Sequence, residues 1–265
     1  MGNRAATTAP RAGQNYPARS RYTGSVARDY VARRAGGPKW RREQDVVAQC
    51  LRQLPRGSTI LDVPIGTGRF IELYAGCDHH VYGLDVSRDM LAQARAQAGI
   101  HDAKLTPALG EAESLPLLDR SVDYVLCVRL LNWVPLPVLA NMLSEFDRVS
   151  RNGVLIHVRS RNALGLAELL RALVRDVFSR AIPALRGLAR KVGRRLASHS
   201  GSPSDAEEAE SPEGTGYVLH DDAELQEAIR SAGLEVTERI PIQSLTTYSG
   251  SYGRSLFVYV LRRAE

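Results

Sequence analysis

The chain has little of what marks membrane, secreted or metal-dependent proteins. Its three cysteines, Cys50, Cys77 and Cys127, are widely spaced and form no CxxC pair, so a disulfide framework is not expected. No run approaches the ~18–20 apolar residues of a membrane-spanning helix, and no apolar h-region follows Met1. The six histidines are not grouped at ligand spacing, so no metal site is predicted. These absences favour a cytoplasmic protein.

What is present fits one globular domain with a basic surface at two places. Hydrophobic residues make up 44% of the 265 residues and charged residues 24%, as in chains with a well-formed core. The net charge of +6 is uneven: residues 1–42 carry +9, residues 164–196 carry +6, and the remainder carries −9. The two basic segments predict either solvated surfaces or contact with an anionic partner, such as a membrane surface or RNA.

Apolar segments of strand length alternate with helical segments along most of the chain. Residues 1–20 have almost no apolar periodicity and are expected to form a disordered basic arm. A helical pattern then extends from Tyr22 to Leu54, with Pro38 suited to a helix start. The predicted strands are 58–63, 80–86, 104–109, 123–128, 153–158, 234–242 and 255–261, and the helices between them end at 74 or span 88–98, 138–150 and 222–232. This order predicts a doubly wound α/β fold with a mostly parallel sheet.

An insertion interrupts this alternation over residues 160–216, within a domain that spans residues 21–261. Residues 164–196 show a long amphipathic helical pattern that Pro183 should kink. Residues 198–216 are rich in Ser, Pro, Glu and Gly and are expected to be flexible. The basic helices could lie on an anionic membrane, at the periphery, or pack over the active site; we favour packing.

The segment most informative about chemistry is Ile60–Phe70. A buried strand ends at Asp62, glycines Gly66 and Gly68 follow, and a helix begins, so a ligand could approach the backbone closely. Asp85 ends the next strand, where an acid can accept both hydroxyls of an adenosine ribose. A dinucleotide-binding dehydrogenase would need a third glycine, which this loop lacks.

Three motifs in order resemble the class I S-adenosylmethionine-dependent methyltransferases, especially the ubiquinone-biosynthesis-like branch. They are LDVPIGTGRF, GLDVSRDML and GEAESLPLLDRSVDYVLC, and the resemblance covers roughly residues 22–160 and 217–261. The chain departs from the family at Pro64, which replaces the first loop glycine, and at Ile65, where some relatives have cysteine. The resemblance implies a Rossmann-like sheet of seven strands, the last antiparallel, and S-adenosylmethionine as cofactor.

The resemblance also implies roles for individual residues. Asp62, Gly66, Gly68 and Arg129 would surround the methionine part of the cofactor, and Asp85 would hold the ribose. Met90 would lie against adenine, Glu111 would contact the adenine amine, and the Ala112 N–H would meet a ring nitrogen.

Candidates on the acceptor side are fewer. His220 is a candidate general base, although we favour a structural role for it at a helix entry beside the capping Asp221 or Asp222. Tyr22 and Tyr30 occupy the helix that often covers the cofactor in relatives, and their alternative role is packing. Asn132 and Trp133 follow the fourth strand, where they would shape the substrate pocket or anchor a loop.

The sequence thus predicts methyl transfer to a small-molecule or lipid-like metabolite, at an O, N or C atom. The cofactor carries its own leaving group, so the protein mainly positions the reactants and excludes water. Two alternatives stay open: methylation of RNA bound by the basic segments, and a non-catalytic partner protein that binds S-adenosylmethionine.

Overall fold

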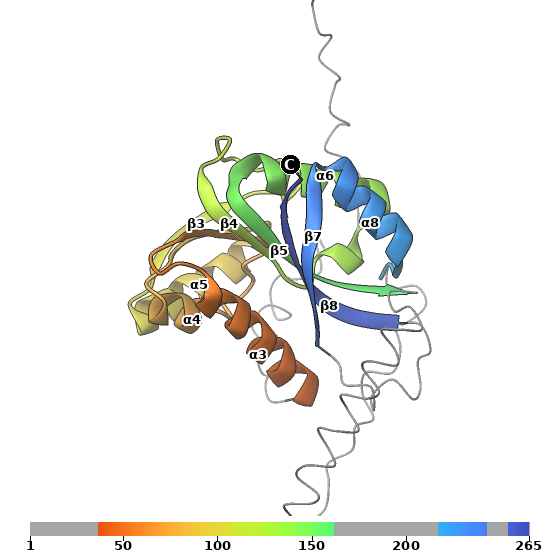
Figure 1. The fold of residues 1–265 in the computed structure, drawn as a ribbon. Coiled ribbons are helices and arrows are strands. Elements are labelled where there is room, and N and C mark those ends of the chain that lie inside the picture. The colour runs from red at the N-terminus through yellow and green to blue at the C-terminus, as the bar shows by residue number, and fades with distance from the viewer. Residues whose placement is uncertain (1–36, 162–216, 243–253, 265) are drawn as a thin grey trace, which may run out of the picture.

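The computed structural model describes residues 37–161, 217–242 and 254–264 (Figure 1). The predictions for the arm 1–20, for Tyr22 and Tyr30, for the amphipathic segment 164–196 and for the linker 198–216 lie outside the described residues. Within the described ranges, no helix is both long and apolar enough to cross a bilayer.

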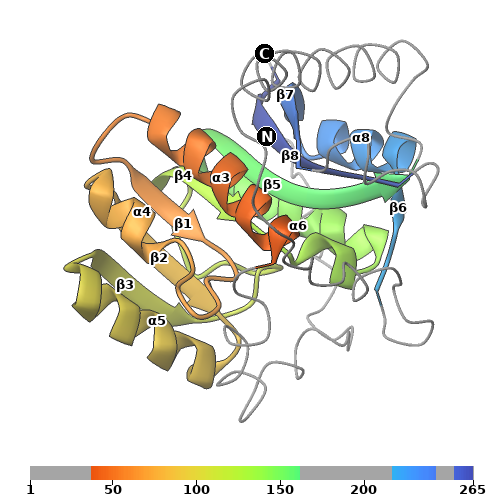
Figure 2. The same cartoon turned by 90° about the horizontal axis from the view of Figure 1, so that it is seen from below.

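In the part of the chain that the structure describes, five α-helices flank one central sheet. Figure 2 shows α3 (Pro38–Gln53), α4 (Ile71–Gly76) and α5 (Arg88–His101) on one face, with α6 (Leu136–Val149) and α8 (Asp222–Ser231) on the other. A single 3₁₀ turn, η1, covers Leu131–Trp133. The strands are β1 (Thr59–Asp62), β2 (His80–Asp85), β3 (Lys104–Leu109), β4 (Val122–Cys127), β5 (Ser150–Arg161), β6 (His220–Asp221), β7 (Leu234–Pro241) and β8 (Arg254–Arg263).

The strand order confirms the doubly wound prediction. The sheet runs β3-β2-β1-β4-β5-β8-β7, and the two-residue β6 adds an eighth strand beside β5. All pairs are parallel except those of β8, which runs antiparallel to both β5 and β7. The last strand is therefore the antiparallel one, as the resemblance implied. The order reverses between β1 and β4, where open α/β sheets usually bind ligands.

Strand β5 is twice as long as the sequence indicated. It covers Ser150–Arg161 because β4 pairs with its first half, while β8 pairs with residues 154–161. Its last residues, Arg159 to Arg161, are polar, so apolar periodicity could not predict them. The pairing with a distant strand sets the end of β5, a non-local effect.

Each face of the sheet has its own apolar core. On one face Leu61, Val125 and Ile156 pack with α6 and α8; on the other Ile60, Leu126 and Leu155 pack with α3, α4 and α5. The alternation along each strand sends successive side chains to opposite faces. Both faces are covered, which explains why these strands are almost continuously apolar.

We predict that Gly68→Ala lowers stability more than Gly57→Ala. Both glycines have a left-handed backbone, with φ of +79° and +76°, so both variants lose about 1–2 kcal/mol to strain. A Cβ at Gly57 would meet nothing within 4 Å, whereas one at Gly68 would lie 2.9 Å from Ile71 Cγ1 and 3.0 Å from Ala94 Cα. Overpacking against α5 adds about 1–3 kcal/mol. Urea unfolding of both variants measures the difference, and equal losses would contradict this packing.

Candidate active site

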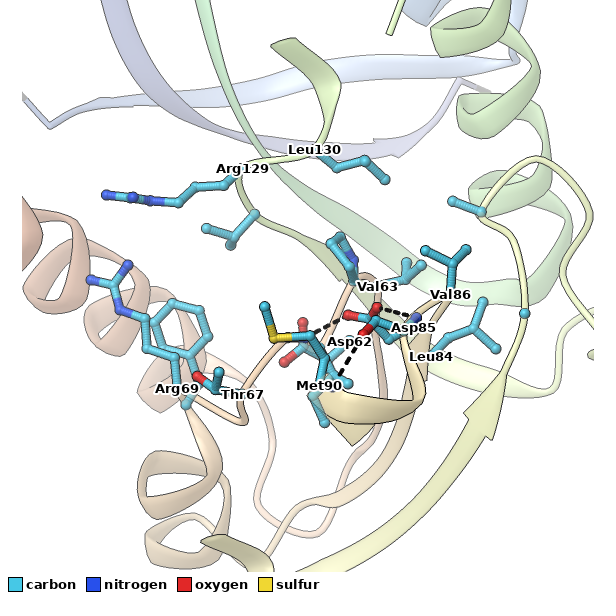
Figure 3. A pocket seen from close by; sticks show the side chains of 18 of the residues that line it. Asp62, Val63, Thr67, Arg69, Leu84, Asp85, Val86, Met90, Arg129 and Leu130 are labelled. Carbon is cyan, nitrogen blue, oxygen red and sulfur yellow. Dashed lines mark hydrogen bonds between the residues drawn. The ribbon is translucent and has the colours of Figure 1, made fainter. Parts of the chain in front are cut away.

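A cavity lies at the carboxyl ends of β1, β2 and β4, at the point where the strand order reverses (Figure 3). It is bordered by the loop after β1, the turn between β2 and α5, the start of the loop after β3 and the segment after β4. The residues that line it are Asp62–Thr67, Arg69, Phe70, Leu84–Ser87, Met90, Gly110, Ala112, Val128–Leu130 and Trp133. Three separate sequence motifs are thus brought to one place, as their order predicted.

The loop after β1 is held between its two neighbouring strands. The Ile65 N–H donates to Leu84 O at 2.9 Å, and the Val63 N–H donates to Leu126 O at 2.9 Å. Gly66 has a φ of +57°, and a Cβ there would meet nothing within 4 Å, so this side of the loop is open. Gly68 was predicted beside the cofactor, but its missing side chain faces Ala94 of α5, and it does not border the cavity.

Asp85 is the acid at the end of β2, and it connects three parts of the site. Its Oδ2 accepts the Gly66 N–H at 2.9 Å, and its Oδ1 accepts the Ser87 N–H at 2.9 Å. Burial raises the pKa of this carboxyl, although the backbone N–H donors act in the opposite direction. Ser87 then caps α5 by accepting the Met90 N–H. The carboxylate borders the cavity where an adenosine ribose is expected.

Asp62 ends β1 and is only 1% exposed. Tyr74 of α4, a residue that the sequence analysis missed, donates its hydroxyl to Asp62 Oδ2 at 2.9 Å. Burial is the main reason that the pKa of Asp62 rises to about 8; nearby Asp85 raises it further, and the Tyr74 hydrogen bond partly opposes the rise. An acid in this state favours a cationic ligand, because a positive charge beside it would stabilise the carboxylate.

The predicted adenine side is built mainly by Met90, Gly110 and Ala112, which all line the cavity. Glu111 lies between two of these residues but does not border the cavity itself. Its backbone carbonyl accepts the Ser114 N–H at 3.3 Å in a small bridge. Its contact with the adenine amine stays a prediction.

Of the described residues predicted on the acceptor side, one lines the cavity and two lie buried behind its lining. Trp133 lines the cavity and meets Tyr217 edge to face, with 5.3 Å between ring centroids. Asn132 is buried and does not line it; its Nδ2 donates to Arg159 O at 2.7 Å and to Val218 O at 2.9 Å. His220 is also buried outside the cavity lining and donates from Nε2 to Leu131 O at 2.8 Å.

These contacts show what Asn132 and His220 do in the fold: both hold η1 against β5 and β6. Burial lowers the pKa of His220, although its hydrogen bond to Leu131 opposes this. The role of His220 as a general base stays a prediction. Because His220 does not line the cavity, a proton would have to reach it through other groups.

Two arginines line the cavity. Arg129, at the end of β4, was predicted from the sequence, whereas Arg69, directly after the glycine loop, was not. Figure 3 shows both on the side of the cavity away from Leu84 and Val86. Their partners lie on α3, so no local sequence signal could have paired them. Among the described residues, no group of three or more His, Cys, Asp or Glu side chains is placed to hold a metal ion.

The donor set fits S-adenosylmethionine. Asp85 offers a carboxylate for two ribose hydroxyls, and the apolar surface of Met90 and Ala112 suits a purine ring. Asp62 suits the ammonium of the methionine part, and Arg129 suits its carboxylate. The open side of the loop at Gly66 provides room for close approach of a ligand to the backbone.

Comparison with known proteins supports this assignment independently. Residues 60–153 match a family model described as a methyltransferase domain. Over this segment, about a third of the chain, the protein is similar to methyltransferase domains. This match begins in β1 and ends in β5, so it includes every residue that lines the cavity.

Two curated relatives illustrate the similarity in sequence. A malonyl-[acyl-carrier protein] O-methyltransferase of Yersinia pestis is 36% identical over 106 residues, which are 40% of this chain and 38% of the relative. A phosphatidylethanolamine N-methyltransferase of Cereibacter sphaeroides is 34% identical over 128 residues, 45% of this chain and 60% of the relative. The matches therefore span less than two thirds of either relative.

Solved structures show the same fold across most of the chain. The magnesium protoporphyrin IX methyltransferase from Synechocystis, crystallised with bound S-adenosylhomocysteine, superposes with a TM-score of 0.61 at 14% identity. The superposition covers 93% of this chain and 98% of that one. At this identity the likeness establishes the fold alone.

We predict that Asp62→Asn raises thermal stability above pH 7. Because the folded-state pKa of about 8 exceeds the unfolded value of 3.8, ionisation of Asp62 progressively costs stability as pH rises from about 4 to 8. The variant avoids this cost and can still accept the Tyr74 hydroxyl. Its melting temperature should exceed that of the unmodified chain by several degrees at pH 8, since one kcal/mol corresponds to ~2–4 °C in a domain of this size.

Melting curves at pH 5 and pH 8 test this prediction. The stability advantage of the variant should be clearly smaller at pH 5 than at pH 8. An advantage independent of pH would show that Asp62 does not titrate in this range. The same variant should bind S-adenosylhomocysteine less tightly, because it lacks the anion that faces the ammonium.

Proposed function

We propose that this chain transfers a methyl group from S-adenosylmethionine to a small-molecule or lipid-like acceptor. The observation that carries the proposal is the pair of buried acids, Asp62 and Asp85, at the ends of two adjacent parallel strands beside one cavity. One acid suits the ammonium of the cofactor and the other suits its ribose. The three ordered motifs further support placement near the ubiquinone-biosynthesis-like branch.

The chain's own residues would act by positioning the reactants. Asp85 would orient the ribose and Asp62 would hold the ammonium. The loop at Gly66 would lie close against the ligand between these two groups. When bound, S-adenosylmethionine supplies an activated methyl group with its own leaving group. Alignment of the acceptor with that methyl group, in a site that excludes water, is then the main requirement.

The wall opposite the two acids supports an acceptor with an apolar portion. Val128, Leu130 and Trp133 line the cavity beyond β4, and the edge-to-face contact with Tyr217 fixes the indole ring. The matched relatives are named for a carrier-bound malonyl acid and for a phospholipid amine, both of which are attached to larger groups. We therefore propose a metabolite or lipid-like acceptor in preference to RNA.

Incubation of the full chain with radiolabelled S-adenosylmethionine and fractionated metabolite, lipid and RNA pools tests the proposed reaction. Transfer of label to the metabolite or lipid fraction supports the proposal. Label in RNA alone would replace the proposed acceptor by the RNA alternative. Cofactor binding without transfer to any fraction would favour the non-catalytic alternative.

We predict that Asp85→Ala weakens binding of S-adenosylhomocysteine ~10- to 100-fold, because charge-assisted hydrogen bonds to the ribose are lost. Calorimetry measures this change. Asp89→Ala provides the matched control, since Asp89 is an exposed acid in the first turn of α5. Binding of NAD by the unmodified chain, with no binding of S-adenosylhomocysteine, would overturn the proposed function altogether.

A further inference from the structure

The two arginines that line the cavity contact the same buried carboxylate, that of Glu43 on α3. Glu43 is fully buried and makes ion pairs with Arg69 and Arg129, 26 and 86 residues further along the chain. Arg129 Nε donates to both carboxylate oxygens, at 2.8 and 3.1 Å. His157 Nε2 of β5 lies 3.1 Å from Glu43 Oε2, without the alignment of a hydrogen bond. Helix α3 is thus connected electrostatically to the cavity.

Arg69 serves mainly to hold α3 in place. Its Nη1 donates to Glu43, its Nε to Gln44 Oε1 at 2.8 Å and its Nη2 to Trp40 O at 2.6 Å. The guanidinium also lies over the Trp40 ring, 3.6 Å from the centroid. All three nitrogens therefore contact α3, so Arg69 fixes Glu43 from one side.

Arg129 occupies a different position in this cluster. It lies two residues beyond the end of β4 with a φ of +63°, a left-handed conformation that residues other than glycine rarely adopt and that concentrates at functional sites. Glu43 holds it through Nε, at the base of the guanidinium, and the side chain lines the cavity. One buried carboxylate thus contacts two guanidinium groups that line the cavity.

Glu43 is suited to remain charged. Burial by itself would raise its pKa, but the contacts with His157 and Arg129 outweigh burial and hold the pKa well below its usual range. A permanently ionised carboxylate in a site of low dielectric orients a guanidinium more strongly than a neutral side chain can.

We propose that Glu43 is a positioning residue that holds Arg129 in place to bind the carboxylate of the cofactor's methionine part, which makes the site selective for cofactors that carry this carboxylate. The inference rests on the proposed function and adds to it a determinant on α3. The layout supports it: the arginines lie on the far side of the cavity from Leu84 and Val86, which flank the ribose acid Asp85 (Figure 3). The carboxylate is the end of the cofactor most remote from adenine.

The test compares two ligands that differ only in this group, S-adenosylhomocysteine and decarboxylated S-adenosylhomocysteine. Calorimetry on the full chain should show roughly 10- to 100-fold tighter binding of the ligand with the carboxylate. Glu43→Gln and Arg129→Gln should each reduce this preference about five- to tenfold, mainly by weakening S-adenosylhomocysteine binding. The double variant should reduce it no further than Arg129→Gln does, because Glu43 acts through Arg129.

Asp45→Asn is the matched control, since it removes the same charge from an exposed position of the same helix. It should leave the preference unchanged. If Glu43→Gln does not fold, Arg69→Gln carries the same expectation, because Arg69 fixes Glu43 from the opposite side.

The outcomes separate the two proposals. Binding of neither ligand by the unmodified chain would overturn the proposed function. Equal binding of both ligands would overturn only the carboxylate subsite. If Glu43→Gln weakened both ligands equally, Glu43 would be a structural residue and the positioning role would be wrong.

Discussion

The hydrogen bond from the Gly66 N–H to the Asp85 carboxylate determines the shape of the site. It closes the loop after β1 onto the end of β2, while the other oxygen of Asp85 holds the Ser87 N–H at the start of α5. Ser87 in turn caps α5 through the Met90 N–H, so the residue expected against adenine is fixed by the same acid. These hydrogen bonds fix the loop after β1, the end of β2 and the start of α5 relative to one another. One carboxylate therefore organises the cavity before any ligand arrives, which lowers the cost of ordering on binding.

This organisation has an electrostatic cost. Two acids are buried side by side at the ends of β1 and β2, and each has a raised pKa because burial disfavours its charged form. The positively charged groups of the cavity, Arg69 and Arg129, lie on another side and are held by Glu43. The cavity is thus polarised: the acids lie at the ends of β1 and β2, and the guanidinium groups lie on the side away from Leu84 and Val86. A zwitterionic amino-acid group would match this polarity, because its ammonium would stabilise the charged form of the acids.

The sequence predicted what depends on neighbouring residues and missed what depends on distant ones. Apolar runs predicted every long strand and a doubly wound, mostly parallel sheet, and the glycine loop with Asp62 and Asp85 predicted where the cavity lies, because these signals are local. The end of β5 was missed since β8 sets it by pairing. Loop closure on Ile65 O turns the Cα of Gly68 toward α5, which no spacing in the sequence indicates, and its place beside the cofactor stays a prediction. The contacts of Glu43 with Arg129 and of Asn132 with Val218 each join residues 86 positions apart, and no spacing in the sequence signals them.

The boundary of the family match separates the cavity lining from residues that brace it. Residues 60–153 include every residue that lines the cavity. Residues outside this range brace the cavity from two sides. Glu43 fixes Arg129 from α3, whereas Tyr217 contacts Trp133 and Val218 accepts the Asn132 amide beside η1. Since Trp133 forms the wall beyond β4, a change at Tyr217 would alter that wall without touching the acids at the ends of β1 and β2.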